Sequence, residues 1–329
     1  MAVAANTNET YDVTTIREDL AEAMASITPT ETIFMSTIGS RNVDNTYFEW
    51  TEVDLAATGA NRRIEGDVLG NDAPTNAVRK GGYTQISAKV VEVSSTNQAV
   101  NGVANAQTVA KQVAYKLSEL KRDMEAMLLD NVASAAGASG TARQTAGLPA
   151  YLTSNVSRGA GGANGTTSGA GESGSVNAAA TDGTLRPLTE ALLKGVIADC
   201  WNAGATPTVV MCGSGQKQKI STFTGNATRF KEAEDSKLNA AIDVYISDFG
   251  EVQVVPNRHM RVRTVTGVDY TPDVFILDPS YAEVAYLQTA KQEALAKTGL
   301  SERRLISCEY GLQVTSQKAH GVVADVNAA

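Results

Sequence analysis

The longest regular hydrophobic pattern of the chain lies in residues 103–131. Its apolar positions recur at alternating steps of four and three, which is the spacing that aligns side chains along one face of an α-helix. The members of this stripe are Ala106, Ala110, Val113, Leu117, Leu120, Met124 and Met127. Such a helix would be roughly 40 Å long at a rise of 1.5 Å per residue. Because the stripe contains two small alanines and no flanking charge pattern repeats, we expect the helix to lie across a sheet and not in a coiled coil.

Two segments alternate between apolar and polar residues, as strands with one buried face do. The first is 46–53, with Phe48 and Trp50 on one face, and the second is 83–93. The link 58–82 is rich in glycine and too long for an ordinary connection within a compact domain, so we expect a projecting functional loop. The candidates for contacts between subunits are two aromatic residues of the first strand and four cations of the loop: Phe48, Trp50, Arg62, Arg63, Arg79 and Lys80.

The remaining patterns predict further helices and strands. One helix is expected from an N-cap at Thr189 to a stop at Gly204, and a shorter one at 216–223. The turn 248–250 (Asp-Phe-Gly) predicts that the strands on either side of it form a hairpin. The expected strands are 208–212, 244–246, 252–255, 274–277, 284–287 and 305–314. Because helices and strands are segregated and do not alternate strictly, the fold class expected is α+β.

Two segments contain too little apolar surface to fold on their own. Residues 1–44 are sparsely apolar, with one short helical pattern at 16–24, and we expect an arm that lies against something else. Residues 157–184 hold eight glycines and no aromatic residue. Because such a segment cannot offset the entropy lost on ordering, we expect a flexible loop there.

The charge balance argues against nucleic acid as the principal ligand. The 329 residues include 28 basic and 36 acidic ones, a formal charge of −8, whereas binding of nucleic acid usually needs a basic face. Hydrophobic residues make up 43% of the chain, enough for a sizeable core. No apolar run approaches the ~18 residues that span a bilayer. The start of the chain lacks a signal-peptide pattern and the three cysteines are scattered, so we expect cytoplasmic synthesis without export.

A search for catalytic chemistry finds no candidate site. The two histidines, His259 and His320, are isolated, and no cysteine or histidine spacing fits a zinc site. The segment 213–217 (Gly-Ser-Gly-Gln-Lys) follows an apolar strand as a phosphate-binding loop does, but it is too short and no Ser or Thr follows Lys217 to hold Mg²⁺. We therefore expect no catalytic residue, no cofactor, no metal and no enzymatic activity. The features that remain are typical of a subunit that contacts copies of itself.

Two groups of short motifs carry a family resemblance. The first group is 27–39 (Ile-Thr-Pro-Thr-Glu-Thr-Ile-Phe-Met-Ser-Thr-Ile-Gly), 46–51 (Thr-Tyr-Phe-Glu-Trp-Thr) and 54–55 (Asp-Leu). The second group is 295–299 (Leu-Ala-Lys-Thr-Gly), 301–302 (Ser-Glu), 309–310 (Glu-Tyr) and 318–321 (Lys-Ala-His-Gly). In these motifs, and in the order of the elements between them, the sequence resembles the major capsid proteins of a group of tailed bacteriophages, whose subunits have the Hong Kong 97-type fold.

The resemblance implies a division of the chain. It makes 1–44 the N-terminal arm and 45–95 the extended hairpin loop (E-loop) that reaches over a neighbouring subunit. The peripheral domain with its long spine helix would be 96–139, and the axial domain, which contains the glycine-rich loop 157–184, would be 140–268. Residues 269–329 would return to the peripheral domain, where His320 would have a structural role.

The resemblance also implies a function. The chain would be a structural protein of the virion, assembled in the bacterial host cytoplasm into hexamers and pentamers of an icosahedral head that encloses double-stranded DNA. We expect its partners to be copies of itself, a portal protein and separate scaffolding or decoration proteins, with DNA held only weakly and no membrane contact. No long helical scaffolding segment precedes the arm in this sequence, so a separate scaffold, or none, is expected. The alternatives are an encapsulin-like compartment and a secreted Gly/Ser-rich surface adhesin, and the missing signal peptide and the free cysteines count against the adhesin.

Overall fold

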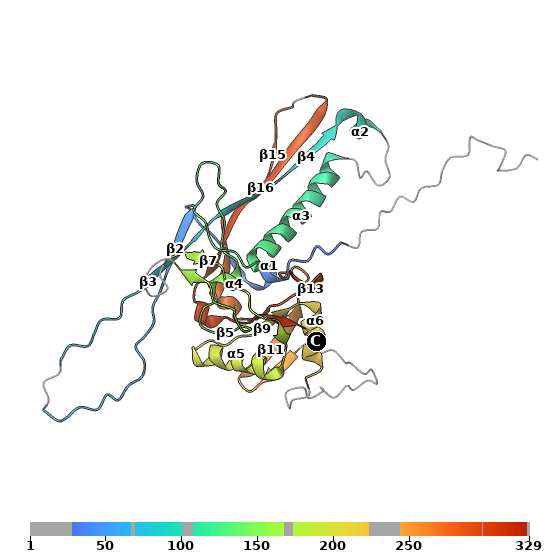
Figure 1. Cartoon of the computed structure of the whole chain (residues 1–329). Coiled ribbons are helices and arrows are strands. Elements are labelled where there is room, and N and C mark those ends of the chain that lie inside the picture. The colour runs from blue at the N-terminus through green and yellow to red at the C-terminus, as the bar shows by residue number, and fades with distance from the viewer. Residues whose placement is uncertain are drawn as a thin grey trace, which may run out of the picture.

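The computed structural model describes residues 28–66, 70–100, 108–167, 174–223, 244–297 and 299–327. Two main sheets organise them into an α+β fold, as expected (Figure 1). In the view of Figure 1 a four-stranded sheet with a long helix forms the upper part, and a six-stranded sheet with two further helices forms the lower part. The helical pattern at 16–24 lies outside the described residues.

The upper sheet has the strand order β1-β15-β16-β4. The bounds of its strands are Gly39–Asn42 (β1), Ala282–Ala294 (β15), Ser301–Val314 (β16) and Gln85–Ser94 (β4). β1 pairs in parallel with β15, and the other pairs are antiparallel. β4 forms one edge and is followed by the short helix α2, Ser95–Ala99. The strands predicted at 83–93, 284–287 and 305–314 are confirmed.

Helix α3, Val109–Leu129, packs on this sheet against β4 and β16 (Figure 1). Its N-cap is Thr108, whose side chain accepts a hydrogen bond from the Lys111 backbone N–H at 3.4 Å. The helix has 21 residues and is therefore shorter than the predicted 103–131, because Thr108 has an extended backbone. Residues 103–107 lie outside the described part of the chain.

The two faces of α3 differ as the sequence pattern predicts. Leu120, Met124 and Leu128 are buried, whereas Lys111 on the opposite side is exposed. An apolar stripe that faces a sheet removes its surface from water, which is the main favourable term in folding. The prediction of a helix that lies across a sheet is confirmed.

The lower sheet has the strand order β10-β11-β9-β14-β17-β5. The bounds of its strands are Val244–Ser247 (β10), Gly250–Pro256 (β11), Val209–Cys212 (β9), Val274–Leu277 (β14), Gly321–Val323 (β17) and Val156–Ser157 (β5). Helix α5, Glu190–Asn202, packs against β17 and β5, and helix α6, Ser214–Ser221, packs against β11. Thr189 caps α5 and Gly204 follows its end with a φ of +95°, so both predicted ends of this helix are confirmed.

Residues 269–329, which were expected to return to the peripheral domain, contribute strands to both main sheets. β14 and β17 lie in the lower sheet, whereas β15 and β16 lie in the upper sheet. The four residues of β14 are all buried, because both faces of a central strand are covered. After β14 the chain crosses to the upper sheet through the short helix η3, Pro279–Tyr281, and it returns through η4, Gln317–Ala319.

The N-terminal segment is more firmly held than the expected arm. Its described part, 28–44, contains helix α1, Ile33–Thr37, and strand β1. Phe34 is fully buried and Ile38 nearly so, and both belong to the main apolar core. The expectation that this segment buries little is therefore wrong for its last residues, because β1 completes the upper sheet of the same subunit.

The glycine-rich segment is also packed where it is described, at 157–167 and 174–184. Strands β6, Thr166–Thr167, and β7, Val176–Ala178, pair with each other within it. Its two ends are held by Asp325, whose carboxylate accepts hydrogen bonds from the backbone N–H groups of Gly159 at 3.1 Å and Gly183 at 2.8 Å. The prediction of a flexible loop is wrong for these residues, because backbone groups of the segment find partners far along the chain.

Arginine side chains reinforce this attachment. Strand β12, Arg263–Val265, forms a hairpin with β13, Val268–Tyr270, and its Arg263 pairs with Asp325 at 3.0 Å. Arg261 bridges Asp182 of the glycine-rich segment at 2.8 Å and the buried Asp273 at 3.0 Å. Strand β18, Val326–Asn327, then pairs with β8, Arg186–Pro187. The end of the described chain thus encloses the glycine-rich segment.

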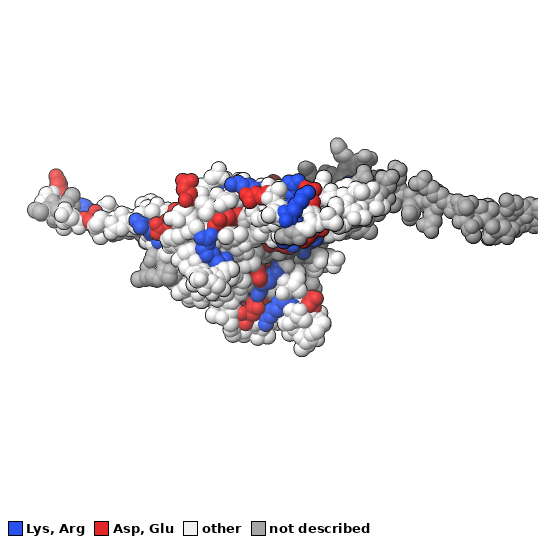
Figure 2. All heavy atoms as spheres, turned by 90° about the horizontal axis from the view of Figure 1, so that it is seen from above, with Lys and Arg blue, Asp and Glu red and all other residues white. Residues whose placement is uncertain are grey.

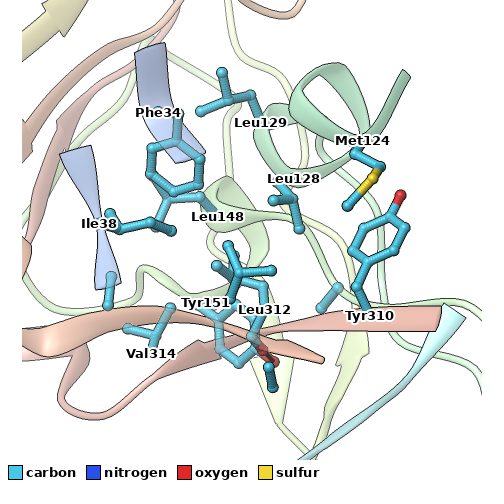
Figure 3. Packing of buried hydrophobic residues seen from close by; sticks show 14 of the residues in the cluster. Phe34, Ile38, Met124, Leu128, Leu129, Leu148, Tyr151, Tyr310, Leu312 and Val314 are labelled. Atoms are coloured by element: carbon cyan, nitrogen blue, oxygen red, sulfur yellow. Dashed lines mark hydrogen bonds between the residues drawn. The ribbon is translucent and has the colours of Figure 1, made fainter. Parts of the chain in front are cut away.

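The apolar core is continuous between the two sheets. Figure 3 shows one part of it, where α1, α3, α4 (Leu148–Tyr151) and β16 meet. Phe34, Leu128 and Leu148 are completely buried there. The Tyr151 hydroxyl donates a hydrogen bond to the Leu312 carbonyl at 3.0 Å, which ties α4 to β16.

Candidate assembly surface

A two-stranded hairpin carries the projecting loop of the molecule. Strand β2, Tyr47–Glu52, pairs antiparallel with β3, Val78–Tyr83. Phe48 and Trp50 point into the subunit, 4% and 8% exposed, while Glu49 between them is exposed. The predicted alternation of this strand is confirmed.

The aromatic face of the hairpin is anchored in its own subunit. A Cβ added at Gly311 of β16 would lie 2.7 Å from the Phe48 ring, and one added at Gly82 would lie 2.9 Å from it. These contacts are closer than real Cβ atoms make, so only glycine leaves room for the ring. Phe48 and Trp50 are thus buried in their own subunit, and their role as candidates for contacts between subunits stays a prediction.

Beyond the hairpin the loop has no regular secondary structure in its described parts, 53–66 and 70–77. Every residue of these two stretches is exposed, and the loop projects from the body at the lower left of Figure 1. Leu55 and Ile64 are 84% and 81% exposed. The prediction of a projecting loop agrees with this geometry, but the sequence reasoning missed both apolar residues. The available signal was that they are large apolar residues in a loop of small and charged ones.

The four cations assigned to the loop separate into two pairs. Lys80 forms an ion pair with Glu52 at the base of the hairpin, where both side chains are largely buried, and Arg79 lies 3.7 Å from Glu49 on its exposed side. Lys80 is thus held within its own hairpin, whereas the Arg79 side chain stays 72% exposed, and the role of both in contacts between subunits stays a prediction. Arg62 and Arg63 are exposed at the tip and make no ion pair with any described residue.

The base of the loop also joins the two motif groups of the sequence. Asp54, the second residue after β2, forms an ion pair with Lys318 of η4 at 2.6 Å. Both side chains are substantially exposed, so this pair contributes little stability. Motifs 264 residues apart in the sequence therefore meet at the root of the projecting loop.

A second exposed feature runs along the free edge of β4. An open groove of about 430 Å³ lies between β4 and α3. Its charged residues are paired: Lys89 with Asp123 at 2.6 Å, and Lys116 with Glu119 at 2.8 Å. The hydrogen bond from Lys116 lowers the pKa of Glu119, and the hydrogen bond to Asp123 raises the pKa of Lys89.

The edge strand itself is partly apolar. Ile86 and Val90 of β4 are 61% and 48% exposed on the face away from Lys89. A long edge strand with exposed apolar residues is a surface on which another chain can lie. Figure 2 shows that acidic and basic side chains are interspersed over the face drawn there, without one large patch of a single sign.

The three cysteines and His320 are buried in the subunit. Burial raises the pKa of the Cys200 and Cys212 thiols to about 12 and that of Cys308 to about 11, so none of the three is a reactive thiolate. His320 is fully buried, and burial lowers its pKa to about 4. Its Nδ1 accepts a hydrogen bond from the Asp278 N–H at 3.4 Å, which is a structural contact.

The glycine turn at 213–217 does not form a phosphate site. A Cβ at Gly213 would lie 2.1 Å from the Thr271 hydroxyl, so the space beside this turn is already filled. The Lys217 ammonium donates a hydrogen bond to the Val254 carbonyl at 2.7 Å. The contacts of residues 213–217 are those of an ordinary turn between a strand and a helix.

Two further searches cover only the described residues. Within them, no group of three His, Cys, Asp or Glu side chains is arranged to hold a metal ion. No helix among them is both long enough and apolar enough to cross a membrane.

Comparison with solved structures shows the fold. Gordonia phage Cozz has a chain that is 12% identical, with a TM-score of 0.63 over 99% of this chain and 98% of that one. The holo-SrpI encapsulin complex from Synechococcus elongatus is also 12% identical, with a TM-score of 0.57 over 95% of this chain and 94% of that one. At these identities the likeness concerns the fold alone, and it confirms the expected Hong Kong 97-type fold.

Comparison of sequences shows the family. The major capsid protein of Escherichia phage Phieco32 is 30% identical over 147 residues, which are 44% of this chain and 39% of that protein. The match thus spans well under two thirds of the length of this curated relative. The pattern of the SU10 major capsid protein family matches residues 5–327, nearly the whole chain. This chain therefore belongs to the SU10 major capsid protein family, which confirms the resemblance of its motifs to phage major capsid proteins.

Proposed function

We propose that this chain is the shell subunit of an icosahedral phage head, in which it forms hexamers and pentamers around double-stranded DNA. The observation that carries the proposal is the projecting loop with Leu55 and Ile64 at its base and tip. Large apolar side chains that are more than 80% exposed on a projecting segment are typical of a contact surface. A neighbouring copy of the chain is the partner that a capsid family implies.

The tip of the loop supplies charge to the same contact. Arg62 and Arg63 lie beside Ile64 on the loop, and acidic side chains are plentiful on a chain with 36 carboxylates. One exposed ion pair is worth only about 0–1 kcal/mol, but a shell repeats each contact many times. Protein interfaces commonly have apolar residues that contribute most of the binding energy, with charged residues around them. Ile64 with its neighbours Arg62 and Arg63 fits this arrangement.

The test is assembly of the full chain expressed alone, imaged by negative-stain electron microscopy. We expect closed shells from the unchanged chain. The double charge reversal Arg62→Glu, Arg63→Glu should leave the circular dichroism spectrum unchanged and abolish most shells. The matched control is Lys111→Glu, Lys121→Glu, which makes the same charge change at two exposed positions of α3.

Two results would contradict the proposed role of the loop. If the loop variant assembles as well as the control, the loop tip is not an assembly contact. A second loop variant, Leu55→Ser with Ile64→Ser, tests the apolar part in the same way, and normal shells from it would contradict the role of these two residues.

The remaining parts of the proposal concern partners. A net charge of −8 disfavours tight binding of DNA to the shell wall, so we expect the isolated subunit to give no salt-sensitive shift of duplex DNA in a gel. A portal protein and separate scaffolding or decoration proteins are proposed as partners, with assembly in the host cytoplasm and no catalytic role. An encapsulin-like compartment is the alternative that the shared fold leaves open, and neighbouring genes for a portal and a terminase distinguish the two. The family match gives no support to the adhesin alternative.

A further inference from the structure

One carboxylate in the core belongs to no catalytic or assembly feature described so far. Glu125 lies on α3 and is 0% exposed. It shares a face of the helix with Leu128 and Leu129, which are three and four residues further on and also completely buried. A charged group in such a position is expensive unless every oxygen finds hydrogen-bond donors.

Three donors from two distant segments satisfy this carboxylate. The backbone N–H of Phe34 donates to Oε1 at 2.6 Å, and that of Met35 donates to Oε2 at 2.9 Å. The side-chain amide of Asn257 donates to Oε1 at 2.8 Å. No Lys, Arg or His of the described chain forms an ion pair with Glu125, so neutral donors alone stabilise the charge.

The two donor segments belong to different parts of the molecule. Phe34 and Met35 lie in α1, where the N-terminal segment enters the core. Asn257 directly follows β11 of the lower sheet, and it is itself nearly fully buried. Its backbone N–H donates to the Cys212 carbonyl of β9 at 2.9 Å, and its Oδ1 accepts from the His259 N–H at 2.8 Å.

Shared donors on one buried charge make the two contacts interdependent. When one donor is lost, the closed state keeps an incompletely satisfied carboxylate, whereas the opened state offers water to the same oxygens. Loss of the Asn257 donor therefore makes it easier for α1 to detach from Glu125, and loss of the α1 donors makes it easier for the Asn257 loop to detach. This is a coupling free energy between two sites in the sense used for allostery.

We propose that Glu125 couples the docking of α1 to the order of the loop 257–259 of the lower sheet. A neighbour that pulls or holds the N-terminal segment thereby acts on the six-stranded sheet, and contacts made by that sheet act on the segment. The use of this coupling in a shell rests on the proposed function, but the coupling itself is a property of the single subunit. Its test is therefore independent of whether shells form.

The experiment is hydrogen–deuterium exchange of the full chain, followed at the amides of Phe34 and Met35. The variant Asn257→Ala removes the donor from the lower sheet and touches neither amide. We expect at least fivefold faster exchange at both amides. The matched control is Arg258→Ala, an exposed neighbour in the same loop, for which exchange should stay within twofold of the unchanged chain.

A double variant tests whether the effect of Asn257→Ala passes through the side chain of residue 125. In the Glu125→Met variant neither acceptor oxygen remains, so adding Asn257→Ala should change exchange at Phe34 and Met35 by less than twofold. If Asn257→Ala does not fold, the isosteric Asn257→Asp keeps the acceptor for His259 and places a second carboxylate against Glu125, and it should give the same acceleration.

Two results would overturn the proposal. One is unchanged exchange at Phe34 and Met35 in Asn257→Ala or Asn257→Asp while the loop 257–259 exchanges faster. The other is a fivefold effect that persists in the Glu125→Met background, since the effect would then pass through another contact.

Discussion

Asp325 is the residue at which the packing of the glycine-rich segment can be tested most directly. Asp325 is 1% exposed. Its carboxylate accepts hydrogen bonds from the backbone N–H groups of Gly159 and Gly183 and from the Arg263 guanidinium, the last at 3.0 Å. Asp325→Asn keeps the shape of the side chain but replaces one acceptor oxygen by an NH₂ group. At least one of the three N–H donors then faces the new NH₂ group, which is also a donor and cannot accept its hydrogen bond.

The expected cost follows from these contacts. A hydrogen bond to a charged group is worth about 1.5–3 kcal/mol, and a buried donor left without a partner costs about 1–3 kcal/mol. Breaking a buried ion pair from one side typically costs about 3–5 kcal/mol. Because Arg263 retains partial access to water and lies near Asp182 as well, we place the loss at the lower end, about 3 kcal/mol. That is a large share of a typical free energy of unfolding of about 5–15 kcal/mol.

The assay is urea denaturation of the full chain, combined with hydrogen–deuterium exchange at Gly159 and Gly183. Asp325→Asn should lower the free energy of unfolding by about 3 kcal/mol and accelerate exchange at both amides. The matched control is Asp269→Asn, the same change at an exposed carboxylate of β13 that accepts one hydrogen bond from Thr264, where we expect less than about 0.5 kcal/mol. If the two variants had the same free energy of unfolding, the reasoning would be refuted, and the contacts of Asp325 would not hold the glycine-rich segment.

Three further predictions concern the core. Leu120→Ala should cost about 2–5 kcal/mol and Lys111→Ala less than about 0.5 kcal/mol, measured by thermal unfolding, and equal effects would mean that α3 is not a core element. Burial holds the folded pKa of His320 at about 4, below its ordinary value of 6.5, so the unfolded chain binds the extra proton between these pH values. Stability should therefore be complete above pH 6.5 and fall by about 3 kcal/mol towards pH 4, and unfolding of His320→Gln measured across this range should show a flatter dependence. Gly311→Ala should destabilise the subunit by about 1–3 kcal/mol in urea, since its Cβ would meet the Phe48 ring at 2.7 Å, and wild-type stability would mean that the ring has room to move.

The elements that the sequence predicts correctly are those with a local periodic pattern. The stripe with Leu120 and Met124 predicts α3 and its buried face, and the alternation around Phe48 predicts strand β2. The capped helix α5 and the β10–β11 hairpin follow in the same way from neighbouring residues. In each case the burial period is set within a few residues, so no distant partner is needed to infer it.

The candidate site was predicted only in outline. The length and composition of 58–82 predict a projecting loop, but the roles of its cations depend on partners that the pattern does not reveal. Lys80 is held by Glu52 across the hairpin, whereas Arg62 has no described partner. The difference arises from the register of two strands, which brings together residues separated by 28 positions in the sequence.

The tertiary structure alone decides which distant segments satisfy one another. β14 and the apolar first residues of β15 are separated by only a few residues, yet they belong to different sheets. Asp325 accepts a hydrogen bond from a backbone N–H of the glycine-rich segment, and Glu125 accepts one from α1, and no sequence pattern distinguishes these N–H groups. A hydrophobic period is a property of neighbouring residues and can be read from the sequence, whereas the donor that reaches a buried carboxylate depends on how the whole chain closes.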